Sequence, residues 1–126
     1  MTTHRVLLIE DDDDIRRVFG LALMKEGFAV TEANDGLEAL DIVQTDEFDA
    51  LVLDLSMPRV DGAAMLDTFR TMPSGKKVPI IVVTALDDPA IEQRTMEAGA
   101  TAFLRKPILP TKVSSTVRRH LAASDQ

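Results

Sequence analysis

The sequence has no cysteine, no tryptophan and no tyrosine among its 126 residues, and phenylalanine occurs five times. Without cysteine the chain forms no disulfide and offers no thiolate for catalysis or for a zinc site. Without tryptophan or tyrosine it has no indole or phenol ring to stack on a flavin, which disfavours a flavin carrier. Redox chemistry is therefore not the function that this composition favours.

Basic side chains are also scarce, with 14 Lys and Arg against 21 Asp and Glu and a formal net charge of −7. Nucleic acids and anionic membranes select surfaces on which Lys and Arg cluster. We therefore expect no nucleic-acid partner and no membrane partner. Phosphate chemistry at one local site stays open, because a bound metal ion can supply the positive charge.

Long apolar runs are missing as well. The first run, Val6–Ile9, is too short for the core of a signal peptide and far too short for a membrane span. We therefore expect a cytoplasmic chain. The length suits one domain, and a hydrophobic content of 45% is ordinary for a globular protein. The expectation is a single domain over residues 1–126.

Five short apolar runs alternate with segments of helical period. The two most continuous runs, Val6–Ile9 and Val78–Val83, are typical of strands that are buried on both faces of a parallel sheet. Alternation of strands and helices predicts an α/β fold with a parallel sheet and helices on both faces. The five predicted strands are Val6–Ile9, Phe28–Thr31, Ala50–Leu53, Val78–Val83 and Ala102–Leu104.

The helical segments carry apolar stripes and recognisable ends. Asp35 and Asp88 are predicted as helix N-caps, and Gly27 and Gly99 as the residues that end helices. Pro89 and Pro110 stand where first helical residues belong. The predicted buried stripes are Ile15, Val18, Phe19, Ala22 and Leu23; Leu37, Leu40 and Val43; Met65, Leu66 and Phe69; and Val113, Val117 and Leu121.

Polar side chains follow four of the five strands. In parallel α/β sheets, ligands bind beyond the carboxyl ends of the strands. Carboxylates that gather there repel each other by about 4 kcal/mol at 4 Å and an effective dielectric near 20. A divalent cation offsets this repulsion, and oxygen ligands suit Mg²⁺. The residues at these strand ends are Glu10 and Asp11, Asp54, Thr84, and Lys106.

This set of residues can support phosphoryl transfer to a carboxylate. Asp54 could attack phosphorus and form an acyl phosphate. Mg²⁺ and Lys106 would neutralise charge on the phosphoryl oxygens, and the hydroxyl of Thr84 could donate a hydrogen bond to one of them.

At these residues the sequence resembles the receiver domain of two-component response regulators, of the chemotaxis-regulator type. The resemblance runs from about Arg5 to Leu121, the expected domain core. Each motif alone is weak, but four in this order are highly specific. The motifs are Val6–Asp12, Leu53–Pro58 with Asp61 and Gly62, Val83–Ala85, and Ala98–Ala100 leading to Lys106 and Pro107.

The resemblance implies a flavodoxin-like (βα)5 fold, with a five-stranded parallel sheet in the order 2-1-3-4-5. It implies that Asp54 is the phosphoacceptor and that Glu10, Asp11, Asp54 and the backbone carbonyl of Ser56 hold Mg²⁺. The phosphoryl donor would be a phosphohistidine on a sensor histidine kinase or a histidine phosphotransfer protein. The signal would pass to a downstream protein or to an attached output domain.

The resemblance also implies a switch. Thr84 matches the family's switch hydroxyl, Phe103 the aromatic switch position, and Lys106 the phosphate-binding lysine. A cis peptide before Pro107 is suggested in the same way.

Three departures from the family pattern stand out. Glu10 replaces the aspartate that is common at the first acidic position, which lengthens the reach to a metal by one methylene. Phe103 replaces the commoner tyrosine and has no hydroxyl for a partner to bond. The acidic run continues through Asp12–Asp14, which we interpret as a solvated loop that caps the first helix.

The main alternative is a haloacid-dehalogenase-like phosphatase with Asp54 as nucleophile. Such enzymes use a second aspartate two residues later, where this chain has Ser56. A degenerate receiver that binds partners without phosphorylation is the other alternative, which the intact set of site residues disfavours. We therefore expect a receiver that promotes its own phosphorylation and dephosphorylation, not an enzyme that turns over an external substrate.

Overall fold

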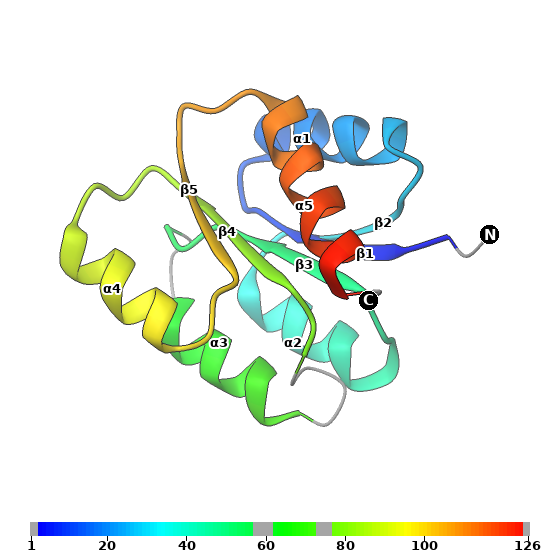
Figure 1. The fold of residues 1–126 in the computed structure, drawn as a ribbon. Helices are drawn as coiled ribbons and strands as arrows, with labels where there is room; N and C mark the ends of the chain where they lie inside the picture. The colour runs from blue at the N-terminus through cyan, green and yellow to red at the C-terminus, as the bar shows by residue number, and fades with distance from the viewer. Residues whose placement is uncertain (1–2, 57–61, 73–76, 125–126) are drawn as a thin grey trace.

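The computed structural model describes residues 3–56, 62–72 and 77–124. Within these ranges, strands and helices alternate along the chain (Figure 1). The motif residues Met57, Pro58 and Asp61 lie outside the described residues. The elements are β1 (Arg5–Ile9), α1 (Asp13–Lys25), β2 (Ala29–Ala33), α2 (Gly36–Thr45), β3 (Ala50–Leu53), α3 (Gly62–Thr71), β4 (Ile80–Thr84), α4 (Pro89–Glu97), β5 (Ala102–Arg105) and α5 (Pro110–Ser124).

The strands form one parallel sheet in the order β2-β1-β3-β4-β5. Helices α1 and α5 cover one face, and α2, α3 and α4 cover the other (Figure 1). The predicted α/β class and the strand order 2-1-3-4-5 are therefore confirmed. Because all strands run in one direction, the residues that follow them lie along the same edge of the sheet.

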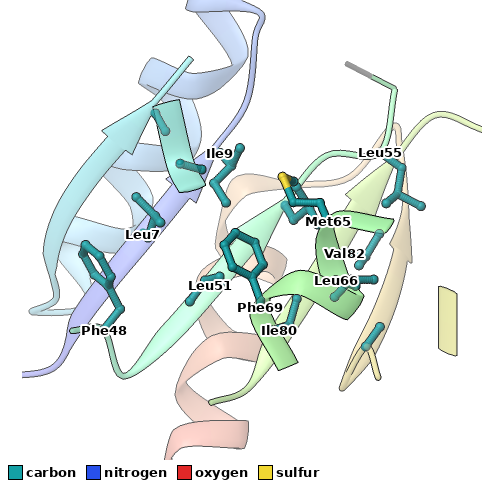
Figure 2. Close-up of a cluster of buried hydrophobic side chains, with 14 residues drawn as sticks. Leu7, Ile9, Phe48, Leu51, Leu55, Met65, Leu66, Phe69, Ile80 and Val82 are labelled. Atoms are coloured by element: carbon teal, nitrogen blue, oxygen red, sulfur yellow. The ribbon is translucent and has the colours of Figure 1, made fainter. Parts of the chain in front are cut away.

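The sheet separates two hydrophobic cores. Leu7 and Ile9 of β1 point to the α2, α3 and α4 side, where they pack in one cluster with Phe69 of α3 (Figure 2). Val6 and Leu8 point to the opposite side, toward α1 and α5. Successive residues of a strand face opposite sides, so a strand between two helical layers needs apolar residues at every position. This is why the runs in the sequence are continuous.

The predicted helix ends are confirmed. The carboxylate of Asp35 accepts from the amide of Glu38 at 2.8 Å, and that of Asp88 accepts from the amide of Ala90 at 2.9 Å. Gly27 follows α1 with φ 95°, and Gly99 follows α4 with φ 116°. Residues that carry a Cβ rarely adopt a positive φ, so glycine suits both positions.

Two residues of the predicted buried stripes are exposed, Val18 at 47% and Leu37 at 64%. Val18 lines a surface groove together with Pro107 and Ile108. Leu37 lies in the first turn of α2, beyond the core that Leu40 and Val43 contact. Helical periodicity predicts which side of a helix faces the sheet, but not how far the sheet extends beneath it.

No helix in the described ranges is both long enough and apolar enough to cross a bilayer.

Candidate functional site

Three carboxylates meet at the carboxyl end of the sheet. β1 and β3 are neighbours, and Ile9 pairs with Leu53 in their register. The residues that follow each strand are therefore brought together. One oxygen each of Glu10, Asp11 and Asp54 lie within 4.8 Å of one another. Glu10 and Asp54 are buried, whereas Asp11 is exposed.

Lys106 lies between two of these carboxylates. Its Nζ is 2.7 Å from Oε1 of Glu10 and 3.0 Å from Oδ2 of Asp54. Lys106 follows β5, two strands away from β3, and its long side chain spans the end of β4. Its backbone amide donates to the carbonyl of Thr84 at 2.8 Å, and the peptide bond to Pro107 is cis.

Asp54 is held in its ionised form. Its Oδ1 accepts from the backbone amide of Ser56 at 2.9 Å and from the Ser56 hydroxyl at 2.7 Å. Burial alone would raise the pKa of Asp54, but these hydrogen bonds and the one from Lys106 outweigh burial and lower the pKa below 3.8. A carboxylate with this pKa is a nucleophile at neutral pH without a general base.

The pKa of Glu10 is shifted in the opposite direction. Burial raises the pKa of Glu10 from 4.5 to about 7, although the hydrogen bonds from Lys106 and from the amide of Asp12 act against it. For Lys106, burial alone would lower the pKa, but its bonds to Glu10 and Asp54 raise it above 10.5. Lys106 therefore stays positively charged at neutral pH, and its single charge is shared between Glu10 and Asp54.

Of the two predicted switch residues, Thr84 is bonded to Lys106 of this cluster through its backbone carbonyl, and Phe103 lies on β5, three residues before Lys106. Thr84 ends β4 and is fully buried, and its Oγ1 accepts from the amide of Leu86 at 3.2 Å. Phe103 is partly buried against the core on the α2, α3 and α4 side. The guanidinium of Arg105 lies 5.7 Å from the centre of the Phe103 ring.

Two contacts of the site were not predicted from the sequence. The first is the pair of bonds from the amide and hydroxyl of Ser56 to Asp54, because the family resemblance points only to the Ser56 carbonyl. The spacing could have suggested it, because an Asp side chain commonly accepts from the backbone two residues later. The second is Arg16, whose Nη1 donates to the backbone carbonyl of Glu10 at 2.8 Å. Its partner atom is on the backbone, so sequence alone gave no signal for it.

Comparison with known proteins identifies the class to which this fold and site belong. The sequence profile of the response regulator receiver domain matches residues 6–118. The chain therefore belongs to the response regulator receiver domain family, and it is homologous to the phosphoacceptor receiver domains of two-component systems. This finding favours the predicted receiver and gives no support to the phosphatase alternative.

Individual relatives agree with that class. The chain is 38% identical over 114 residues to the response regulator MprA of Mycobacterium leprae, covering 90% of this chain and 49% of that protein. It thus spans about half the length of the curated relatives that it matches. The chemotaxis response regulator CheY4 of Vibrio cholerae is 32% identical, with a TM-score of 0.88 and coverage of 94% and 99% of the two chains.

A third relative is the receiver domain of a sensor histidine kinase from Pseudomonas aeruginosa. It is 26% identical, with a TM-score of 0.86 and coverage of 96% of this chain and 99% of that one. That structure has a magnesium ion coordinated in its active site cleft.

Proposed function

We propose that Asp54 accepts a phosphoryl group from a phosphohistidine of a sensor histidine kinase or a histidine phosphotransfer protein. The observation that carries the proposal is a buried carboxylate with a lowered pKa, held by Ser56 and Lys106 beside two further carboxylates. Membership of the receiver family supports the same role.

The donor set of the site fits Mg²⁺. Three carboxylates share this end of the sheet, and Lys106 contacts two of them. One lysine does not balance three carboxylates when all of them are ionised, and carboxylate and carbonyl oxygens are the ligands that Mg²⁺ prefers. Glu10, Asp11, Asp54 and the backbone carbonyl of Ser56 would hold the ion, as in our sequence prediction. When bound, Mg²⁺ would neutralise charge on the phosphoryl oxygens.

The transfer itself needs little from the protein beyond positioning and charge. An oxygen of Asp54 attacks phosphorus, the P–N bond of the phosphohistidine breaks, and the imidazole nitrogen keeps the electron pair. Lys106, within 3.0 Å of Asp54, stabilises the negative oxygens of the phosphoryl group. The Thr84 oxygen already accepts from Leu86, so its hydroxyl proton can be donated to a phosphoryl oxygen.

The phosphorylated domain would act through its surface. A phosphoryl group that draws the Thr84 hydroxyl inward would let the Phe103 ring change position, and the surface around α4, β5 and α5 would follow. A downstream protein or an attached output domain would recognise that surface. We place this activity in the cytoplasm, without a nucleic-acid or membrane partner for this domain, and we expect no turnover of an external substrate.

Incubation with acetyl phosphate and MgCl₂, followed by intact-mass measurement, tests the proposal. We expect one added phosphoryl group in the wild-type protein, and none in Asp54→Asn or after chelation of the metal. Asp14→Asn is the matched control, because Asp14 is exposed and lies outside the carboxylate cluster, and it should be labelled like the wild type.

An unlabelled wild-type protein, or equal labelling of Asp54→Asn, would contradict the proposal. Multiple turnover of phosphomonoesters would instead favour the phosphatase alternative.

A further inference from the structure

Asp11 is the exposed member of the carboxylate cluster. The buried members, Glu10 and Asp54, each accept hydrogen bonds through both carboxylate oxygens. In the part of the chain that the structure describes, the Asp11 carboxylate accepts no hydrogen bond from the protein. The protein therefore constrains the Asp11 carboxylate only through the backbone that carries it, and the side chain turns among its own rotamers.

Arg16, in the first turns of α1, holds the peptide group that precedes Asp11. Its Nη1 donates to the carbonyl oxygen of Glu10 at 2.8 Å, and its Nη2 donates to Oδ1 of Asp13 at 2.6 Å. The Glu10 carbonyl belongs to the peptide group that joins Glu10 to Asp11, and that group is planar. A bond to this oxygen fixes the plane from which Asp11 projects.

The peptide group on the other side of Asp11 is held as well. The amide of Asp12 donates to Oε2 of Glu10 at 3.2 Å. The Asp12 side chain accepts from the amide of Ile15 at 3.0 Å and caps α1. Asp11 thus lies between two held peptide groups, and Arg16 supplies the contact on the first of them.

The Arg16 side chain is well placed to hold one orientation. It is 17% exposed, although Asp13 beside it is 85% exposed. The planar guanidinium forms two bonds at once, which fixes its direction in a way that a lysine ammonium does not. Arg17, the next residue, is exposed on the same helix.

We infer that Arg16 is a positioning residue for Mg²⁺ binding: by fixing the peptide group between Glu10 and Asp11, it directs the Asp11 carboxylate toward the ion. The inference rests on the proposed function, since it requires that Glu10 and Asp11 bind Mg²⁺. It concerns a residue that does not touch the ion or the phosphoryl group.

If Arg16 is lost, a positioning role and a purely electrostatic role predict opposite changes in Mg²⁺ affinity. Arg16 carries a positive charge close to the cation site, so its removal would strengthen Mg²⁺ binding if charge alone mattered. Loss of a residue that orients a metal ligand weakens metal binding, commonly by about tenfold or more. The sign of the change in affinity therefore separates the two roles.

Isothermal titration of the metal-free protein with MgCl₂, well below the melting temperature, measures this affinity. We expect Arg16→Gln to weaken Mg²⁺ binding by about tenfold. Arg16→Lys, which keeps the charge but loses the two-point contact, should also bind more weakly than the wild type. Arg17→Gln is the matched control and should stay within about twofold of the wild type. Thermal unfolding of each variant establishes that it is folded.

Equal or tighter Mg²⁺ binding by Arg16→Gln, with normal binding by the wild type, would overturn this inference and leave the proposed function standing. Failure of the wild-type protein to bind Mg²⁺ would instead overturn the metal site on which both depend. Weaker binding by both Arg16 variants, with an unchanged Arg17→Gln, would support the inference.

Discussion

At the scale of single residues, Glu10 and Asp54 show how one site holds two carboxyl groups in different states. Both are buried and both bond to Lys106, but Asp54 also accepts two hydrogen bonds from Ser56. The pKa of Asp54 is lowered, whereas burial raises the pKa of Glu10 to about 7. Asp54, the proposed nucleophile, is thus kept ionised, whereas burial favours the protonated form of Glu10.

The raised pKa of Glu10 predicts the pH dependence of stability in the absence of metal. Between pH 4.5 and about pH 7, Glu10 of the folded protein keeps a proton that Glu10 of the unfolded chain has released. Glu10 therefore stabilises the fold fully below pH 4.5, and this contribution is lost as the pH rises toward 7. The difference between the two pKa values corresponds to about 3 kcal/mol. Urea unfolding at several pH values, with chelator present, measures this slope.

Glu10→Gln is the variant that checks the assignment. It cannot ionise, so its free energy of unfolding should vary less between pH 5 and pH 8 than that of the wild type, by up to about 3 kcal/mol. Asp54 titrates below 3.8 and should not contribute in this window. Identical slopes for the two proteins would show that Glu10 is not the group responsible.

At the scale of elements, Arg70 connects three parts of the fold on the side of the sheet away from α1 and α5. It lies at the end of α3, and its guanidinium donates to the carbonyls of Gly99 and Val78. Gly99 follows α4, and Val78 precedes β4. The C-terminal turn of α4 is therefore held by a side chain from α3. The geometry leaves little room, because a Cβ built on Gly99 would lie 3.0 Å from Nε of Arg70.

Gly99→Ala is expected to destabilise the protein by about 1–3 kcal/mol, because φ 116° is strained for any side chain and the new methyl would press on Arg70. Urea unfolding measures the change. Gly20→Ala is the matched control: Gly20 is helical, and the nearest atom to its added Cβ is Oε1 of the Glu32 side chain at 3.2 Å. That variant should be neutral or gain up to about 1 kcal/mol. Equal losses in both variants would refute the role of the backbone conformation.

Much of the fold was predictable because the three central strands, β1, β3 and β4, are almost entirely buried on both faces. Continuous apolar runs placed all five strands, and β3 was predicted with the right bounds, Ala50–Leu53. The bounds of the other four strands differed by one or two residues, since pairing with a neighbour decides where a strand ends. Thr84, predicted as the residue after β4, is the last residue within it. Apolar content identifies a strand more reliably than its ends.

The sequence predicted which residues meet at the site better than it predicted the hydrogen bonds between them. Glu10, Asp11, Asp54 and Lys106 could be brought together from the topology alone, because parallel strands end at one edge. The bonds of Arg16 and Ser56 depend on side-chain rotamers and on the path of a loop, which residue spacing does not specify. The roles of these residues in phosphoryl transfer stay predictions.

At the scale of the whole molecule, Mg²⁺ should stabilise the fold by mass action. A ligand that binds the folded state alone adds about 2.7 kcal/mol to the free energy of unfolding at about 100 times its Kd. The unfolded chain does not hold the three carboxylates together, so it should bind the ion weakly. Urea unfolding in MgCl₂, compared with NaCl at equal ionic strength, isolates this effect from screening of the net charge of −7.

The effect of Asp11→Asn on the free energy of unfolding should depend on whether Mg²⁺ is present. Without metal, it removes one of three mutually repelling carboxylates, so the variant should be as stable as the wild type or more stable. With MgCl₂, it should gain much less than the wild type, because it has lost a metal ligand. Asp14→Asn removes an equal charge outside the cluster and should keep the full response to Mg²⁺. If Asp11→Asn gained as much as the wild type, the ion would not be bound through Asp11, since a general effect of divalent salt on an acidic protein would treat the two variants alike.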